Sequence, residues 1–161
     1  MQKRQRQAGF TLVELMVVII ILGILSAVAL PKFMDVTTKA NKSAVDGAVG
    51  GLGAGSALLH AQWVANGPTA AQANVAGFGA SDVDTNAAGW AIGTDGTLND
   101  AADCVDIWNG LMQNPPTVST AVGSDYQATF AGTTCTYTYQ ADTARIITYN
   151  TADGAVGKTN N

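Results

Sequence analysis

The dominant feature of the hydrophobic pattern is an apolar run from Leu15 to Leu30, interrupted only by Gly23 and Ser26. Counted from Phe10, the segment is about 30 Å long as a helix, enough to cross the hydrocarbon core of a bilayer. The residues ahead of it include no acid and three basic side chains, Lys3, Arg4 and Arg6. A basic lead before a long apolar segment is typical of a targeted, membrane-inserted helix whose basic end stays in the cytoplasm.

The pattern changes from uniformly apolar to amphipathic between Pro31 and Ala65. Steps of four and three residues place one stripe on a single helix face: Val45, Val49, Leu52, Ser56, Leu59 and Trp63. We expect this stripe to cover a core, and we expect Pro31 to kink or open the helix nearby. Asn66-Gly67-Pro68 supplies the helix stop.

Three glycines in this second half recur every fourth residue, roughly opposite the apolar stripe: Gly47, Gly51 and Gly55. Each costs nearly 1 kcal/mol relative to Ala in a helix interior. One interpretation is a smooth face that a neighbouring helix approaches closely. The other is a frayed or bent helix in a glycine-rich chain, and the pattern does not decide between them.

The remainder of the chain predicts a loop, a short helix and a sheet. Residues 68–96 are rich in small and polar side chains and indicate a long surface connection, with one short strand near Gly89–Ile92. A short helix is expected over Asn99–Met112, ended by Pro115-Pro116. Alternating β-branched and aromatic residues predict an antiparallel meander of three strands: Tyr126–Phe130, Thr133–Gln140 and Ile146–Asn150. One sheet face should pack on the helix stripe, and the tail from Ala152 to Asn161 carries no core signal.

Glu14 is the one charged residue inside the apolar segment. A carboxylate near the bilayer centre costs on the order of 2.5–3.5 kcal/mol or more. Because Glu14 is close to the start of the segment, it could simply lie at the headgroup level. Alternatively, it is retained for a partner of opposite charge that arrives within an assembly.

The stretch Gly9-Phe10-Thr11-Leu12-Val13-Glu14, after a short basic leader and before the apolar run, resembles the signal of type IV pilins and pseudopilins. The resemblance implies that a prepilin peptidase removes residues 1–9 and methylates Phe10. It also implies that Glu14 is the family's buried glutamate, and that Pro31 is its helix-kinking proline. Cleavage after Gly9 would expose an amine at Phe10, which could pair with Glu14 of another copy and set the axial register of a filament.

The overall layout also resembles the α+β type IV pilin fold, in which a long N-terminal helix packs on a C-terminal antiparallel sheet. It implies a hydrophobic helix over residues 10–30 and a globular head over residues 31–161. Pro31-Lys32-Phe33 is similar to the sequence that follows the membrane segment in mannose-sensitive haemagglutinin-type pilins. The specific match covers roughly the first 35 residues, and the rest agrees in layout only.

The two cysteines, Cys104 and Cys135, predict a disulfide, because an even count in an exported protein favours pairing. The bridge would contribute roughly 3–4 kcal/mol on the chain-entropy view. Two reduced buried thiols remain the alternative. A metal site is less favoured, because the chain has 1 histidine.

Charge and motif content argue against nucleic-acid binding and catalysis. Removing the leader leaves five basic against 12 acidic residues, a formal charge of −7, whereas nucleic acid requires clustered Lys and Arg. His60 is expected to be structural or solvent-exposed, no nucleophile motif is apparent, and no cofactor is expected. One acidic group could bind calcium but is more typical of a solvated surface: Asp95, Asn99, Asp100, Asp103 and Asp106.

The sequence therefore predicts a structural subunit of an extracellular type IV pilus that serves adhesion, motility or related surface functions. Its precursor would lie in the inner membrane of a Gram-negative bacterium. The resemblance implies assembly ATPases, a platform protein and an outer-membrane secretin as partners. The alternatives are a type II secretion pseudopilin, which the cysteine pair and the long loop disfavour, and a membrane-anchored monomeric binding module or adhesin. An enzyme head on an anchor would need a polar pocket that the sequence does not indicate.

Overall fold

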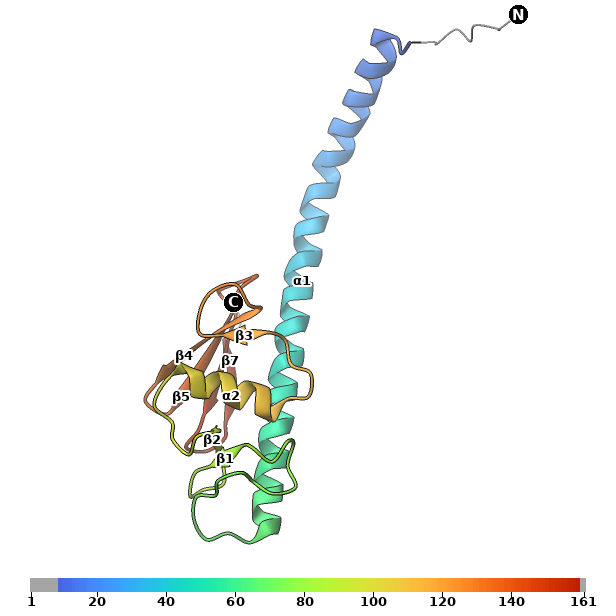
Figure 1. Ribbon diagram of the computed structural model, residues 1–161. Coiled ribbons are helices and arrows are strands. Elements are labelled where there is room, and N and C mark those ends of the chain that lie inside the picture. Colours follow the sequence, from blue (N-terminus) through green and yellow to red (C-terminus); the bar gives the residue numbers. More distant parts are fainter. Residues whose placement is uncertain (1–8, 160–161) are drawn as a thin grey trace, which may run out of the picture. The chain divides into compact units, whose positions relative to one another are not determined.

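The computed structural model describes residues 9–159, which fall into two compact units, one ending at Ala40 and one beginning at Asn41 (Figure 1). Helix α1 (Leu12–Asn66) supplies the first unit and continues into the second. We term the second unit, over its described residues 41–159, the head. All described strands and the second helix lie in the head.

The first unit contains the apolar part of α1 and the residues that follow it up to Ala40. It includes an 18-residue window of mean hydropathy 2.8, so this helix is long and apolar enough to cross a membrane. We expected Pro31 to kink or open the helix nearby; it lies inside α1, and the helix continues past it without a break. Proline lacks only one backbone donor, so a helix can continue through it at the cost of a single hydrogen bond.

The head confirms the predicted amphipathic stripe of α1. Val45, Leu52, Ser56 and Leu59 are buried, and Val49 and Trp63 pack partly buried against the same core. The helix ends at Asn66, and Gly67 follows with a φ of 68°, the left-handed conformation expected of a C-terminal cap.

A 5-stranded sheet forms in the head with its strands in chain order, β3-β4-β5-β6-β7. Its bounds are β3 Val118–Ser119, β4 Tyr126–Ala131, β5 Thr134–Tyr139, β6 Ile146–Asn150 and β7 Val156–Thr159. Strands β4 to β6 pair antiparallel, as the predicted three-stranded meander requires. Strand β7 adds antiparallel to β6, and the short β3 pairs parallel to β4. The alternation in β5 places Cys135 and Tyr137 in the core, with Thr134, Thr136 and Thr138 on the other side.

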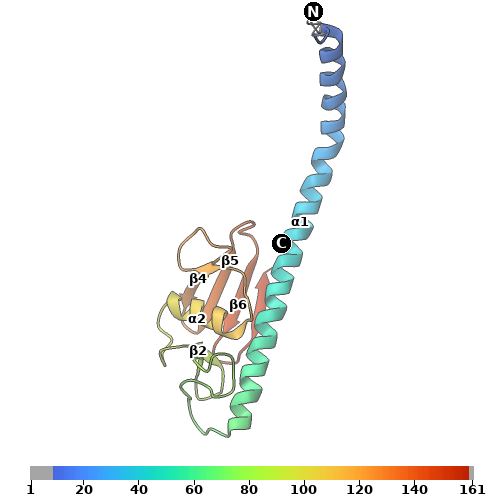
Figure 2. The same ribbon diagram turned by 45° about the vertical axis from the view of Figure 1, so that its right-hand side comes forward.

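Helix α2 (Ala101–Leu111) confirms the expected short helix and contacts the sheet mainly at β4 (Figure 2). Trp108 is fully buried, and its ring lies 4.7 Å from that of Tyr126 and 4.6 Å from that of Tyr137. The indole N–H donates to the carbonyl of Pro116 at 2.9 Å. The core therefore forms between one sheet face and the two helices.

The connection between the helices is more structured than the composition suggested. It contains a 2-stranded sheet of β1 (Asp84–Thr85) and β2 (Ala91–Gly93). The predicted short strand near Gly89–Ile92 corresponds to β2, which overlaps that range at Ala91 and Ile92. Its partner β1 was not expected, because Asp and Thr give no apolar run.

The tail is not free of structure. Val156–Thr159 forms β7 and extends the sheet beside β6. The Lys158 ammonium donates to the Asp46 carboxylate of α1, and this hydrogen bond holds the pKa of Asp46 below its usual value. The tail carries few apolar residues, but Val156 packs against the core, and strand pairing and the ion pair order the rest of β7.

The glycines of α1 do not form one open face. A β-carbon at Gly47 would contact nothing within 4 Å, whereas one at Gly51 would approach the Met112 sulfur to 3.2 Å. Gly55 is buried and lies directly against the main-chain carbonyl of Leu111. The close helix approach therefore occurs at Gly55, within the subunit, and its partner is the end of α2.

Candidate processing and assembly segment

The segment around the expected cleavage site begins the described part of the chain. Gly9 and Phe10 lie before α1, and the Phe10 side chain is 93% exposed. Residues 1–8 of the expected leader lie outside the described residues. The peptide bond between Gly9 and Phe10 therefore lies outside the helix. A peptidase can bind such a segment in an extended conformation.

Glu14 takes part in a capping box at the start of α1. Its carboxylate accepts hydrogen bonds from the Thr11 amide and the Thr11 hydroxyl, both at 2.9 Å. The Glu14 amide donates to the Thr11 hydroxyl oxygen at 3.2 Å. Reciprocal bonds between an N-terminal Thr and a Glu three residues later satisfy backbone donors that a helix start leaves free.

A role was expected for Glu14 but none for Thr11. The Thr-x-x-Glu spacing is itself the signature of a capping box and could have identified the pair. A carboxylate in the first helical turn is also favoured by the helix dipole. Part of the cost of keeping Glu14 beside an apolar run is therefore offset within its own helix.

The apolar side chains after Glu14 have no contacts that bury them within the chain. Leu15, Ile19 and Leu25 are about three-fifths exposed, and similar values hold along the segment. Ser26 donates its hydroxyl to the carbonyl of Leu22 at 2.7 Å, so its polarity is satisfied inside the helix. Such a surface requires lipid or other apolar helices around it.

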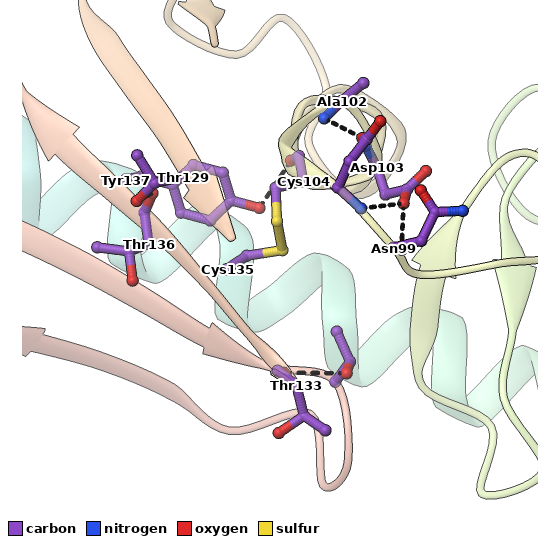
Figure 3. The surroundings of a disulfide bond; sticks show 11 residues. Asn99, Ala102, Asp103, Cys104, Thr129, Thr133, Cys135, Thr136 and Tyr137 are labelled. Carbon is purple, nitrogen blue, oxygen red and sulfur yellow. Dashed lines mark hydrogen bonds between the residues drawn. A yellow bond between two sulfur atoms is a disulfide. The ribbon is translucent and has the colours of Figure 1, made fainter. Parts of the chain in front are cut away.

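Cys104 and Cys135 form a disulfide that joins α2 to β5 (Figure 3). Both residues are fully buried. Beside them the Tyr137 hydroxyl donates to the carbonyl of Cys104 at 2.8 Å, and burial raises the Tyr137 pKa well above 10. The predicted pairing is present, and the alternative of two buried thiols does not apply to this structure.

The acidic group before and within α2 serves local hydrogen bonds. Asp100 caps α2 by accepting from the amides of Ala102 and Asp103, and Asp103 accepts in return from the Asp100 amide. Asp106 accepts from the Thr94 hydroxyl at 2.7 Å. Hydrogen bonds from Thr97 hold the pKa of Asp95 below its usual value. Among residues 9–159, no three acidic, His or Cys side chains gather as metal ligands would.

His60 is stacked between two tryptophans at the C-terminal end of α1. Its ring centroid lies 4.0 Å from that of Trp90 and 5.8 Å from that of Trp63. Its Nδ1 is 3.3 Å from the carbonyl oxygen of Gly89. The structural role expected for His60 fits this stack, which holds the 84–93 hairpin against the helix.

Comparisons with known proteins converge on the N-terminal segment. Residues 4–30 match the prokaryotic N-terminal methylation motif. The chain is 56% identical over 41 residues to the type IV narrow pilus major component PilA5 of Thermus thermophilus, covering 26% of this chain and 35% of that protein. It is 62% identical over 37 residues to the type IV major pilin protein PilE1 of Neisseria gonorrhoeae, covering 23% and 22%.

A type IV major alpha-pilin of Moraxella bovis is 54% identical over 41 residues, covering 26% of each chain. The chain thus matches about a third or less of the length of these curated relatives. No solved structure matches. The α+β arrangement of a long N-terminal helix on a sheet is consistent with the type IV pilin fold. The methylation motif and these similarities together show that the N-terminal segment of this chain is similar to that of type IV pilins.

Proposed function

We propose that the chain is a structural subunit that polymerises into an extracellular type IV pilus, acting in adhesion, motility or related surface functions. The main support is the exposed apolar part of α1, most of which lies within the segment that matches the methylation motif, residues 4–30. A helix with this surface is stable in a bilayer as a precursor and among copies of itself as a polymer. The apolar contact is equivalent in both settings, so transfer between them costs little hydrophobic energy.

Processing is the first step of the proposal. A prepilin peptidase cuts between Gly9 and Phe10 and methylates the new terminus in the inner membrane of a Gram-negative cell. ATPases, a platform protein and an outer-membrane secretin then drive assembly and export. N-terminal sequencing of the mature protein should begin at an N-methylated Phe10, and a mature chain that still begins at Met1 contradicts the processing step.

The second step sets the axial register between neighbouring copies in the filament. The amine freed at Phe10 pairs with Glu14 of an adjacent copy, which relieves the desolvation of both charges only in the assembled state. Pro31, near the end of the apolar segment, lets the helix adjust between lipid and polymer because it already lacks one backbone hydrogen bond.

Two substitutions separate this charge pairing from the capping box with Thr11. Glu14→Ala removes the cap and the charge, whereas Glu14→Gln keeps an oxygen that can accept from the Thr11 amide. Both variants should insert into the membrane but yield at least tenfold fewer sheared surface filaments, counted by electron microscopy. Normal filament yield from Glu14→Gln would show that the charge is dispensable and that Glu14 only caps the helix.

The same preparation distinguishes the alternatives. Long sheared filaments composed of this chain support a pilus. Loss of protein secretion without surface filaments after gene deletion would indicate a secretion pseudopilin. A chain that stays monomeric when detergent is removed would indicate a membrane-anchored binding module.

A further inference from the structure

The sheet has one face that no described helix covers. Because side chains alternate along a strand, the residues opposite the buried ones share a surface, which we term the outer face. All are partly or fully exposed. Its members are Gln127, Thr129 and Ala131 of β4, Thr134, Thr136 and Thr138 of β5, Ile146, Thr148 and Asn150 of β6, and Gly157 and Thr159 of β7.

The outer face carries no ionisable side chain. The mature chain has a formal charge of −7, so two copies repel each other at long range. The acids next to these strands in sequence, Asp125, Asp142 and Asp153, lie in loops and turns at the strand ends. The outer face is therefore where like-charged copies can meet without placing ionised groups directly opposite each other.

Threonine makes the outer face complementary to itself. The register sets Thr129 opposite Thr136, and Thr136 opposite Thr148, so that a row of hydroxyls crosses the middle of the sheet. A hydroxyl both donates and accepts, so identical rows can bond to one another, which a carboxylate or ammonium surface cannot do. Figure 3 shows Thr136 directed away from α2, on the side opposite Tyr137.

The size of the outer face determines how strong such a contact can be. Four strands about 4.8 Å apart and about 20 Å long present roughly 400 Å² per copy. Two copies would bury about 800 Å², below the ~1,200–2,000 Å² of stable interfaces. A single pair is therefore weak, whereas a regular row of heads makes the same contact many times over and gains by avidity.

We propose that the outer face is a self-association surface, through which neighbouring filaments adhere side by side, each outer face meeting that of a copy in the other filament. The inference rests on the proposed function, because the contact becomes strong only in a polymer. Raising the salt concentration should strengthen the association, since it screens the long-range repulsion between negative filaments and leaves the neutral contact intact.

The test compares two substitutions that change the net charge equally. Thr136→Lys places an ammonium at the centre of the outer face, and the control Thr69→Lys places one in an exposed loop. Both make the filament less negative, so general electrostatics predicts slightly more bundling in both. We expect bundles from wild type and Thr69→Lys, and a severalfold lower bundled fraction from Thr136→Lys, by electron microscopy and light scattering of sheared filaments. Wild-type filaments that remain single, or two variants that behave alike, overturn the inference.

A second measurement does not depend on filament formation. If no filaments form, the proposed function fails, but the self-association of the outer face can still be tested. Proteoliposomes that contain the full mature chain display many heads on one vesicle surface. Copies carrying Thr129→Cys, exposed on the outer face, should cross-link between vesicles on mild oxidation several times faster than Thr69→Cys copies. Equal rates overturn the inference. The inference is also overturned if Thr136→Lys leaves bundling intact but abolishes attachment of the filaments to a polysaccharide surface. That result would show that the outer face binds polysaccharide instead of a second copy.

Discussion

Gly55 of α1 lies directly against the main-chain carbonyl of Leu111 at the end of α2, and a β-carbon at position 55 would occupy the same space as that carbonyl. Backbone cannot move aside as a flexible side chain can. The head therefore depends on this glycine for the distance between its two helices.

Gly55→Ala should destabilise the head in spite of the better helix propensity of alanine. Overpacking typically costs about 1–3 kcal/mol, which exceeds the gain of nearly 1 kcal/mol from removing a helical glycine. The measurement is urea unfolding of the purified full chain, followed by tryptophan fluorescence. Gly47→Ala is the matched control, because nothing lies within 4 Å of its added β-carbon, and it should leave the midpoint unchanged or raise it. Equal effects of both substitutions would contradict the close contact.

Removing the cap of α2 should cost about 1 kcal/mol, with a range of about 0.5–2 kcal/mol. Asp100→Ala leaves the amides of Ala102 and Asp103 without their acceptor. We expect a lower urea midpoint without a change in the denaturant slope. Asp100→Asn should recover most of the loss, because its side-chain oxygen still accepts. Failure of Asn to recover stability would point to charge, instead of capping, as the contribution of Asp100.

The disulfide should be resistant to reductant as long as the head is folded. Cys104 and Cys135 are fully buried under Tyr137 and α2, so thiolate attack requires unfolding. Mild reductant should leave the bond intact in native conditions and cleave it in urea, as measured by thiol alkylation and mass spectrometry. The double variant Cys104→Ser, Cys135→Ser should lose roughly 3–4 kcal/mol of stability. Rapid reduction of the native protein would contradict the burial.

Stability should fall between about pH 10 and pH 12. Burial raises the pKa of both Tyr126 and Tyr149 to about 12, whereas the unfolded chain ionises near 10. Both groups bind protons more tightly in the folded state. Their contribution is thus complete below pH 10 and is lost as the pH rises to 12, on the order of 2 kcal/mol for each. Urea midpoints measured from pH 9 to 12 give the dependence of stability on pH. Tyr149→Phe, which removes one of the two ionising hydroxyls, should make the fall in stability with pH shallower.

Periodicity predicted the elements whose cores are hydrophobic. The α1 stripe, α2 and strands β4 to β6 all carry apolar or aromatic residues at the spacing their structure requires, so local sequence is sufficient. Strand β7 was missed because Val156 is its one large apolar residue, and its place depends on pairing with β6 and on the Lys158–Asp46 ion pair. Such contacts join residues far apart in the chain and leave no local pattern.

The candidate site divides in the same way. The processing motif, Glu14 and the cysteine pair are local or countable features and could be predicted. The pairing of Glu14 with Thr11 was equally local and was overlooked. The contact of Gly55 with α2 could not be foreseen, because it depends on where α2 packs, and no spacing within α1 encodes that position.

The distribution of the three tryptophans gives this head two separate optical reporters. Trp108 lies against Tyr126 and Tyr137, close to the disulfide, so its emission responds to the junction of α2 and the sheet. Trp63 and Trp90 stack with His60 at the C-terminal end of α1, so their emission responds to the contact between the 84–93 hairpin and the helix. Spectra of single-tryptophan variants can thus follow detachment of the 84–93 hairpin and opening of the central core as distinct events in the same molecule.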